Sequence, residues 1–230
     1  MKTTRPTPNL VRLSRLGFVN AYLVAEDDGL TLVDTMLPRS QDAILAAARE
    51  LGLPIARIAL THAHGDHVGS LDALAAALPQ AEISISSRDA RLLAGDMSLD
   101  AGEAQGKPRG SFPKIETRPG RLLEPGDRVG SLEVVAAPGH TPGHVAFLDT
   151  RDRTLIAADA YSTLGGVETT AKMNPRFPLP AFATWDRPTA LRSAKALRTL
   201  DPARMAVGHG NVVESPAAAM DRAIARAEGS

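Results

Sequence analysis

Three histidines and an aspartate stand within six consecutive residues of this chain, as His62, His64, Asp66 and His67. The chain has six histidines, so half of them lie in this one hexapeptide. Neither a hydrophobic core nor a solvated surface explains such a cluster. A metal site does, because imidazole suits zinc and similar transition metals and a carboxylate adds an oxygen ligand. Gly65 lets the backbone curl so that these side chains converge.

The segments on either side of the hexapeptide predict that it is a loop between a strand and a helix. Residues 55–60 form a short apolar run that is typical of a buried strand. Residues 68–78 predict a helix, because leucines recur on one face and Pro79 follows as a stop. Metal-binding side chains often occupy such loops, because the packed elements fix both ends.

The composition limits the kinds of partner that we expect. The 230 residues suffice for one large α/β domain or two small ones, and 43% apolar with 23% charged residues is ordinary for a globular protein. The formal net charge is zero, which gives no general attraction to nucleic acid or to an anionic membrane. There is no cysteine, which excludes thiolate ligands and a cysteine nucleophile. We therefore expect a small-molecule substrate; the sequence does not indicate an oligomeric state.

The N-terminal residues predict no export. Residues 1–17 are polar and rich in arginine, and they lack the apolar stretch of a signal peptide. No apolar run approaches the roughly 20 residues that span a bilayer. The expected location is the cytoplasm.

The remaining patterns predict a single α/β domain over residues 1–230, in which two sheets carry helices on their outer faces. We expect further strands at 18–25, 30–34, 81–86, 132–137, 145–148, 154–158 and 204–207. We expect further helices at 40–51, 88–94, 186–200 and 215–229. Two variable segments, near 95–120 and 162–185, are rich in proline or glycine and predict loops over the site.

Other metal-ligand residues follow predicted strands. His140 stands between two Pro-Gly pairs, Asp159 ends the strand at 154–158, and His209 has glycine on both sides. Together with the HxHxDH hexapeptide, in this order, they resemble the metallo-β-lactamase superfamily over essentially the whole chain. The early Asp34, in Leu-Val-Asp, matches another recurrent position of that family.

The resemblance implies a four-layer αββα sandwich of mixed α/β class, with two mixed sheets and the site at one edge. It implies that His62, His64 and His140 bind one metal, that Asp66, His67 and His209 bind a second, and that Asp159 bridges both. Two zinc ions are expected, with iron or manganese as alternatives, because ligand type does not fix the metal.

Three further residues have more than one interpretation. His144 is expected to hydrogen-bond a ligand, since the family pattern favours His140 as the ligand; alternatively it replaces His140 as the ligand, or it is an exposed strand residue. Asp34 either orients a ligand histidine or caps the following turn. Tyr161 is a candidate catalytic residue that hydrogen-bonds a substrate carbonyl, as a tyrosine does at a slightly different spacing in some lactonases of the superfamily; alternatively it is a packed aromatic.

The expected reaction is metal-dependent hydrolysis. A bound zinc ion lowers the pKa of its water toward ~7, so a bridging hydroxide attacks a carbonyl that the other ion polarises. Asp66 is the candidate to orient this nucleophile or to pass a proton to the leaving group. A metal-binding protein without catalysis is the alternative, and it predicts bound metal without turnover.

The choice of substrate rests on weaker signals. About twenty residues follow His209, too few for the helical domain of glyoxalase II, and the chain lacks the cysteine ligand of two β-lactamase subclasses. A lactone or a carboxylic ester is therefore expected; the alternatives are a glyoxalase-II-like thioesterase and a mono-iron dioxygenase of the same fold. The apolar residues of the second variable segment either line an apolar substrate pocket or fill the core: Leu164, Met173, Phe177, Leu179, Phe182 and Trp185.

Overall fold

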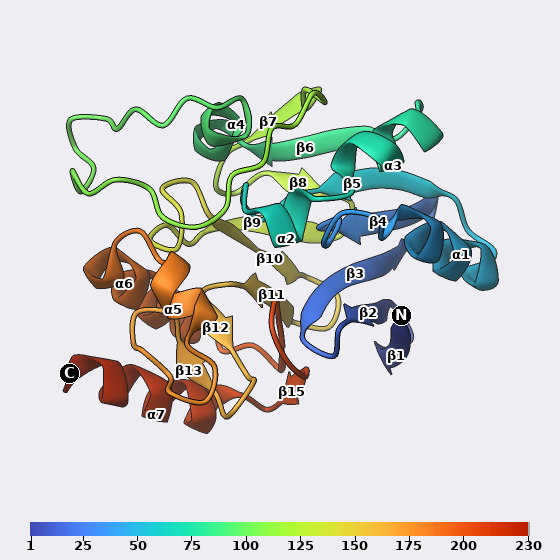
Figure 1. The fold of residues 1–230 in the computed structure, drawn as a ribbon. Helices are drawn as coiled ribbons and strands as arrows, with labels where there is room; N and C mark the ends of the chain where they lie inside the picture. Colours follow the sequence, from blue (N-terminus) through green and yellow to red (C-terminus); the bar gives the residue numbers. More distant parts are fainter. Residues whose placement is uncertain (230) are drawn as a thin grey trace.

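Two β-sheets pack against each other in the computed structural model, which describes residues 1–229 (Figure 1). The first sheet has seven strands in sequence order: β1 (Lys2–Thr7), β2 (Leu10–Arg15), β3 (Val19–Glu26), β4 (Gly29–Val33), β5 (Ile55–Ala59), β6 (Glu82–Ser86) and β7 (Arg121–Leu123). The second has six strands in the order β15 (Val213–Glu214), β14 (Arg204–Val207), β11 (Thr154–Ala158), β10 (Val145–Asp149), β9 (Leu132–Ala136) and β8 (Arg128–Val129). Strands β12 (Tyr161–Ser162) and β13 (Glu168–Thr169) form a separate pair.

Helices cover the outer faces of both sheets, as predicted. The first half of the chain contributes α1 (Gln41–Leu51), α2 (Gly65–Val68), α3 (Leu71–Ala77) and α4 (Ser87–Leu93). The second half contributes α5 (Leu179–Ala183), α6 (Arg187–Thr199) and α7 (Ala217–Glu228). The mixed α/β class and the αββα layering are therefore confirmed (Figure 1). Within residues 1–229, none of these helices has the length and apolar character that crossing a bilayer requires.

The alternation of side chains along the strands builds three hydrophobic layers. In β3, Tyr22 and Val24 face the layer between the two sheets, whereas Ala21 and Leu23 face the layer beneath α1 and α3. A third layer joins the second sheet to α6 and α7, and it includes Leu197. Each sheet thus buries both faces, which explains why its central strands are apolar throughout.

The chain differs from the prediction in several places. The strands β7, β8 and β15 were not predicted, and Gly65–Val68 forms α2 where a loop was expected. The N-terminal segment contains β1 and β2, although its arginines suggested a polar stretch. Arg12 explains the error, because its side chain is buried and its Nη1 donates to the carbonyl oxygen of Gly210 at 2.8 Å. The region 162–184, predicted to be irregular, contains most of the β12–β13 pair and α5.

The ends of several strands meet at one edge of the sandwich. Strands β4 and β5 are parallel, and β9, β11 and β14 all run in one direction, because β9 and β11 are both antiparallel to β10 and β14 is parallel to β11. Asp34 and His62 follow the first pair, while His140, Asp159 and His209 follow the second set. The carboxyl ends of strands with a common direction share an edge, so the topology gathers these residues.

Asp89 ties together two of the loops at this edge. Its side chain is fully buried at the start of α4. One carboxylate oxygen accepts from the backbone N–H of Ala63 at 2.9 Å and from the hydroxyl of Thr141 at 2.8 Å, and the other accepts from the N–H of Gly143 at 2.7 Å. Asp89 therefore fixes the loop after β5 relative to the loop after β9.

This buried carboxyl predicts a pH-dependent stability. Burial raises the pKa of Asp89 from its usual 3.8 to about 6, and the three hydrogen bonds offset only part of that effect. The folded state thus holds this proton more tightly than the unfolded chain. The contribution of Asp89 is most favourable below pH ~4 and falls by about 3 kcal/mol as the pH rises to ~6.

Urea unfolding of the metal-free protein across this pH range measures the effect. The difference in unfolding free energy between wild type and Asp89→Asn should shrink as the pH rises, because the amide does not titrate. Asp42→Asn, at an exposed carboxyl of α1, is the control and should leave the slope unchanged. Parallel curves for wild type and Asp89→Asn would contradict the assignment.

Candidate metal centre

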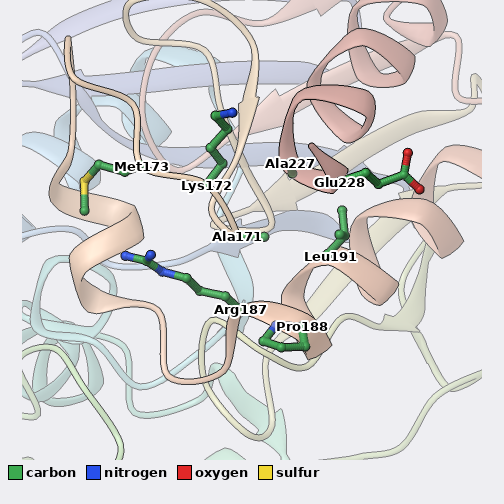
Figure 2. Close-up of a pocket in the computed structure, with 8 residues that line it drawn as sticks. All are labelled: Ala171, Lys172, Met173, Arg187, Pro188, Leu191, Ala227 and Glu228. Carbon is green, nitrogen blue, oxygen red and sulfur yellow. The ribbon is translucent and has the colours of Figure 1, made fainter. Parts of the chain in front are cut away.

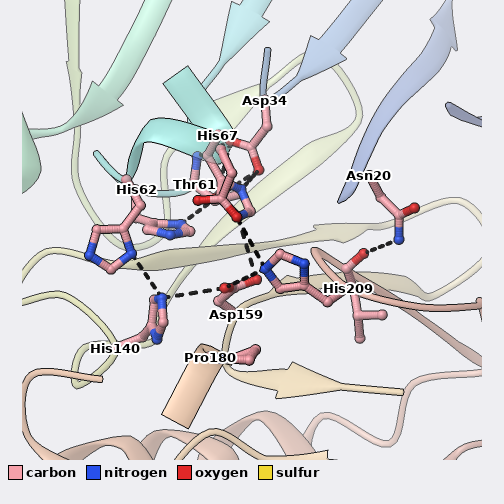
Figure 3. Close-up of polar contacts among 12 residues, drawn as sticks. Asn20, Asp34, Thr61, His62, His67, His140, Asp159, Pro180 and His209 are labelled. Carbon is pink, nitrogen blue, oxygen red and sulfur yellow. Dashed lines mark hydrogen bonds and ion pairs between the residues drawn. The ribbon is translucent and has the colours of Figure 1, made fainter. Parts of the chain in front are cut away.

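The side chains singled out as metal ligands converge where the two sheets meet (Figure 3). One set, position A, consists of His62, His64 and His140; a second, position B, consists of Asp66, His67 and His209. In each set the potential ligand atoms lie within 4.8 Å of one another, the separation expected of donors around a single ion. In each set two members come from the segment after β5 and the third comes from a different loop of the sandwich, so only the folded chain can assemble them.

Asp159 lies between the two positions. Its Oδ2 atom is 3.3 Å from His140 Nε2 of position A and 3.1 Å from His209 Nε2 of position B. Its Oδ1 atom is 3.5 Å from His67 Nε2. A carboxylate that faces both positions is suited to bridge two cations, as the resemblance implied.

Asp34 orients two of the ligand histidines. Its Oδ2 atom accepts from Nδ1 of His67 at 2.7 Å, and both of its oxygens lie within hydrogen-bond distance of the Thr61 hydroxyl. That hydroxyl donates to Asp34 and accepts from Nδ1 of His62 at 3.0 Å. Of the two interpretations of Asp34, the geometry agrees with the orienting role.

His209 is held from the first sheet. Its Nδ1 donates to the carbonyl oxygen of Phe18 at 3.1 Å, at the entry to β3. The amide of Asn20 donates to the carbonyl oxygens of Val207 at 2.9 Å and Gly210 at 2.7 Å, and so holds the loop on both sides of the histidine (Figure 3). The second sheet supplies this ligand, but the first sheet fixes its orientation.

The remaining two histidines of position A take their outer hydrogen bonds from the variable segments. Nε2 of His64 donates to the carbonyl oxygen of Arg109 at 2.8 Å. Nδ1 of His140 donates to the hydroxyl of Thr184 at 3.0 Å, and this hydroxyl donates to the carbonyl oxygen of Pro180 at 2.8 Å. Each of the five histidines thus has one ring N–H bound to an oxygen, which leaves the other nitrogen as a lone-pair donor toward the centre.

Three buried atoms of the centre test whether metal ions fit. His62 Nε2, His67 Nε2 and Asp159 Oδ1 have no hydrogen-bond partner in the part of the chain that the structure describes. Burying unpaired polar atoms is costly, and all three point into the cluster. Cations at positions A and B would satisfy them, and imidazole with carboxylate suits zinc, iron or manganese.

In the metal-free centre, the histidines of the two positions differ in the direction in which their pKa values are shifted. Burial lowers the pKa of His62 and of His140 well below the usual range. Although burial opposes it, the surrounding carboxylates raise the pKa of His67 to about 9 and that of His209 to about 10. Position B therefore carries protons at neutral pH when no metal is bound, and a metal ion there would displace them.

Two predicted residues lie outside the ligand sets. His144 is buried; its Nδ1 donates to the carbonyl oxygen of Ala137 at 3.0 Å, and its Nε2 accepts from the backbone N–H of Asp159 at 3.3 Å. This agrees with a supporting role. Tyr161 is also fully buried, and its hydroxyl donates to the carbonyl oxygen of Ala194 in α6 at 2.8 Å. Of its two interpretations, only the packed aromatic agrees with this placement, because the hydroxyl faces away from the centre.

The sequence analysis missed several supporting residues, among them Thr61 beside His62 and the carbonyl of Phe18 beside His209. Asn20, Asp89, Thr184 and the carbonyl of Arg109 each contact a ligand histidine or the loop that carries one. Their partners lie 26 to 190 residues away along the chain, so local patterns carry no signal of the contact.

The apolar residues of the second variable segment follow neither of the two expected roles uniformly, and Phe112 of the first segment also borders the centre. The ring centroid of Phe112 lies 4.8 Å from that of His64, and the ring centroid of Phe177 lies 5.4 Å from that of His209. Trp185 is instead buried, whereas Leu179 and Phe182 on α5 are 57% and 59% exposed. The two phenyl rings thus give the centre an apolar border on both sides.

A separate cavity of about 500 Å³ lies beside α6 and α7 (Figure 2). Its lining consists of Ala171, Lys172, Met173, Arg187, Pro188, Leu191, Ala227 and Glu228. None of these is a ligand residue of position A or B, so the cavity is distinct from the metal centre.

Comparison with known proteins agrees with this geometry. The chain is 48% identical over 211 residues to the protein YobT of Bacillus subtilis, and the match covers 91% of each. It is 31% identical over 143 residues to a hydroxyacylglutathione hydrolase of Xanthomonas euvesicatoria, which covers 62% of this chain and only 46% of that enzyme. The structure of TTHA1623 in a di-iron-bound form superimposes with a TM-score of 0.67 at 32% identity, covering 90% of this chain and 95% of that one. Residues 14–209 match the family model of the metallo-beta-lactamase superfamily, and the chain belongs to that superfamily.

Proposed function

We propose that this protein is a hydrolase that uses two divalent metal ions, zinc in both positions, to cleave a lactone or a carboxylic ester. The observation that carries the proposal is the pair of ligand sets joined by Asp159, with His62 Nε2, His67 Nε2 and Asp159 Oδ1 buried and without a hydrogen-bond partner within the described residues 1–229. Two divalent ions at such a site supply an activated water and polarise the carbonyl that it attacks.

We assign to Asp66 the role of orienting the attacking water. Its side chain is 31% exposed, whereas those of His67, His209 and Asp159 are at most 6% exposed, so solvent reaches the centre beside Asp66. Although burial opposes it, His67 and His209 hold the pKa of Asp66 well below its usual range. An ionised carboxylate at the solvent side is suited to orient a water molecule and to carry its proton to the leaving group.

The border of the centre supports a substrate with an apolar part. Phe112 packs on His64 of position A and Phe177 on His209 of position B. A substrate carbonyl above the ligands would place its flanking groups against these two rings. This arrangement favours an acyl or aromatic substituent over a strongly charged one.

A thioester is the second candidate. It is supported by the similarity to a hydroxyacylglutathione hydrolase, although the match leaves more than half of that enzyme uncovered. Iron is the metal to test against zinc, since one similar structure is titled a di-iron-bound form. An iron-dependent oxygenase would be recognised by oxygen consumption.

Metal removal should abolish the activity. We expect about two metal ions per chain by elemental analysis, loss of ester or lactone hydrolysis after treatment with a chelator, and recovery when zinc is added. His62→Ala should lose more than about 100-fold in kcat/KM, because even the outer partners of metal ligands are typically worth 10–100-fold. Undiminished activity in the chelated protein would refute the proposal.

Asp66→Asn tests the role of the exposed carboxylate. The amide keeps the shape but cannot carry a proton, so kcat should fall by about 10²–10⁴-fold. Asp42→Asn, at an exposed acid of α1 far from the cluster in sequence, should retain wild-type kcat. An unchanged kcat for Asp66→Asn would remove Asp66 from the proton path.

A substrate panel separates the candidate reactions. We expect higher kcat/KM for lactones and carboxylic esters than for thioesters and phosphodiesters, with a preference of about tenfold for a longer acyl chain. Phe177→Ala should reduce that chain-length preference, since it removes one apolar wall. Dominant phosphodiesterase activity, or oxygen consumption with bound iron, would contradict the lactone or ester assignment.

A further inference from the structure

The two metal positions differ in what holds their ligands. In position B, His67 is oriented by Asp34 at the end of β4, and His209 by the carbonyl of Phe18 beside β3. In position A, by contrast, the outer hydrogen bonds of two of the three histidines end on the variable segments. Ser162 and Thr163 also bind the backbone carbonyl of His209, but both imidazoles of position B are oriented from the first sheet, whereas two imidazoles of position A are oriented from the variable segments.

The first variable segment approaches His64 closely. The N–H of Gly65 donates to the carbonyl oxygen of Ser111 at 2.8 Å, and the rings of Phe112 and His64 meet in a T-shaped, edge contact. Gly110, with φ of +100°, lies so near that a Cβ atom on it would be 2.3 Å from His64 Nε2. Only glycine lets the carbonyl of Arg109 reach the imidazole without displacing it.

The second variable segment holds His140 in a similar way. Thr184 lies at the C-terminal end of α5, and its buried hydroxyl stands between His140 Nδ1 and the carbonyl oxygen of Pro180. The backbone N–H of Trp185 donates to the carbonyl oxygen of His140 at 3.0 Å. The contact runs through both side chain and backbone, so this segment fixes the orientation as well as the place of the ligand.

The two variable segments are also joined to each other. The indole Nε1–H of Trp185 donates to the carbonyl oxygen of Gly106, at the start of the stretch that covers His64. Residues 106–112 and 184–185 thus form one hydrogen-bonded unit, which we call the cap frame.

We propose that Gly110 and Thr184, through the cap frame, are positioning residues that set the metal affinity of position A and leave that of position B unaffected. The inference rests on the proposed function, because it requires that both positions bind metal. Beyond that function, the inference states that the segments bordering the substrate also set how tightly the ion at position A binds. A substrate or a substitution that moves the cap frame would therefore change the occupancy of position A first.

Two substitutions test this inference through metal binding alone. Gly110→Ala introduces the clash with His64, and Thr184→Val removes the acceptor of His140 while keeping the shape. Zinc is titrated into the metal-free full-length protein in competition with a chromogenic chelator, which yields two dissociation constants. One constant should rise by about 10–100-fold, as expected for the loss of an outer partner, and the other should stay within about threefold.

Matched controls separate this effect from general destabilisation. Gly95 has a comparable φ of +90° with no described heavy atom within 4 Å of its Cβ position, so Gly95→Ala carries the backbone strain without the clash. Thr199 is exposed and donates to a helix carbonyl as Thr184 does, so Thr199→Val removes a similar bond away from the centre. Both controls should bind zinc as wild type does.

A His209→Ala background identifies the affected position. This variant lacks a ligand of position B, so its remaining tight site is position A, and adding Thr184→Val should weaken that site. Equal weakening of both constants, no change in either, or the same loss in the controls would overturn the inference. A wild-type protein that binds fewer than two zinc ions would instead refute the two-metal part of the proposed function. If Gly110→Ala does not fold, Thr184→Val alone decides.

Discussion

The oxygen atoms behind the histidines hold the whole centre in place. A buried imidazole has two nitrogens, and it can offer a lone pair inward only if its N–H is satisfied outward. In this protein Asp34, Thr61, Thr184 and two backbone carbonyls perform this task for the five ligand histidines. His62 Nε2, His67 Nε2 and Asp159 Oδ1 are then left without a hydrogen-bond partner among the described residues. Metal ions would satisfy these atoms, and the remainder of the fold brings the outer acceptors to one edge.

Contacts between the two halves of the sandwich hold the candidate ligands in place. His209 follows a strand of the second sheet but is oriented from β3 of the first, and Asp89 of the first half binds the loops that carry His64 and His140. Position A and position B each combine ligands from both halves. The centre therefore forms only when the sheets are packed in one arrangement, which links metal binding to the tertiary structure.

In this fold the same segments contact the candidate metal ligands and border the proposed substrate space. The loops at the ends of the strands carry the candidate metal ligands, and the variable segments carry Phe112 and Phe177 beside them. The same segments also supply the outer acceptors of His64 and His140. A change in these segments would alter substrate fit and the geometry of one metal position together. This constrains how such loops can vary within a working enzyme.

The sequence by itself determined the αββα class and predicted the candidate ligands in their order, because HxHxDH, His140, Asp159 and His209 each follow a strand whose apolar pattern is local. It could not reveal β2, since the buried Arg12 is read as surface charge until its partner, the carbonyl of Gly210, is known. Nor could it decide between the two roles of Tyr161, or find Thr184 and Asp89. A hydrogen bond between residues tens of positions apart depends on the packing of sheets and loops, and so only the tertiary structure decided which side chains orient the ligands.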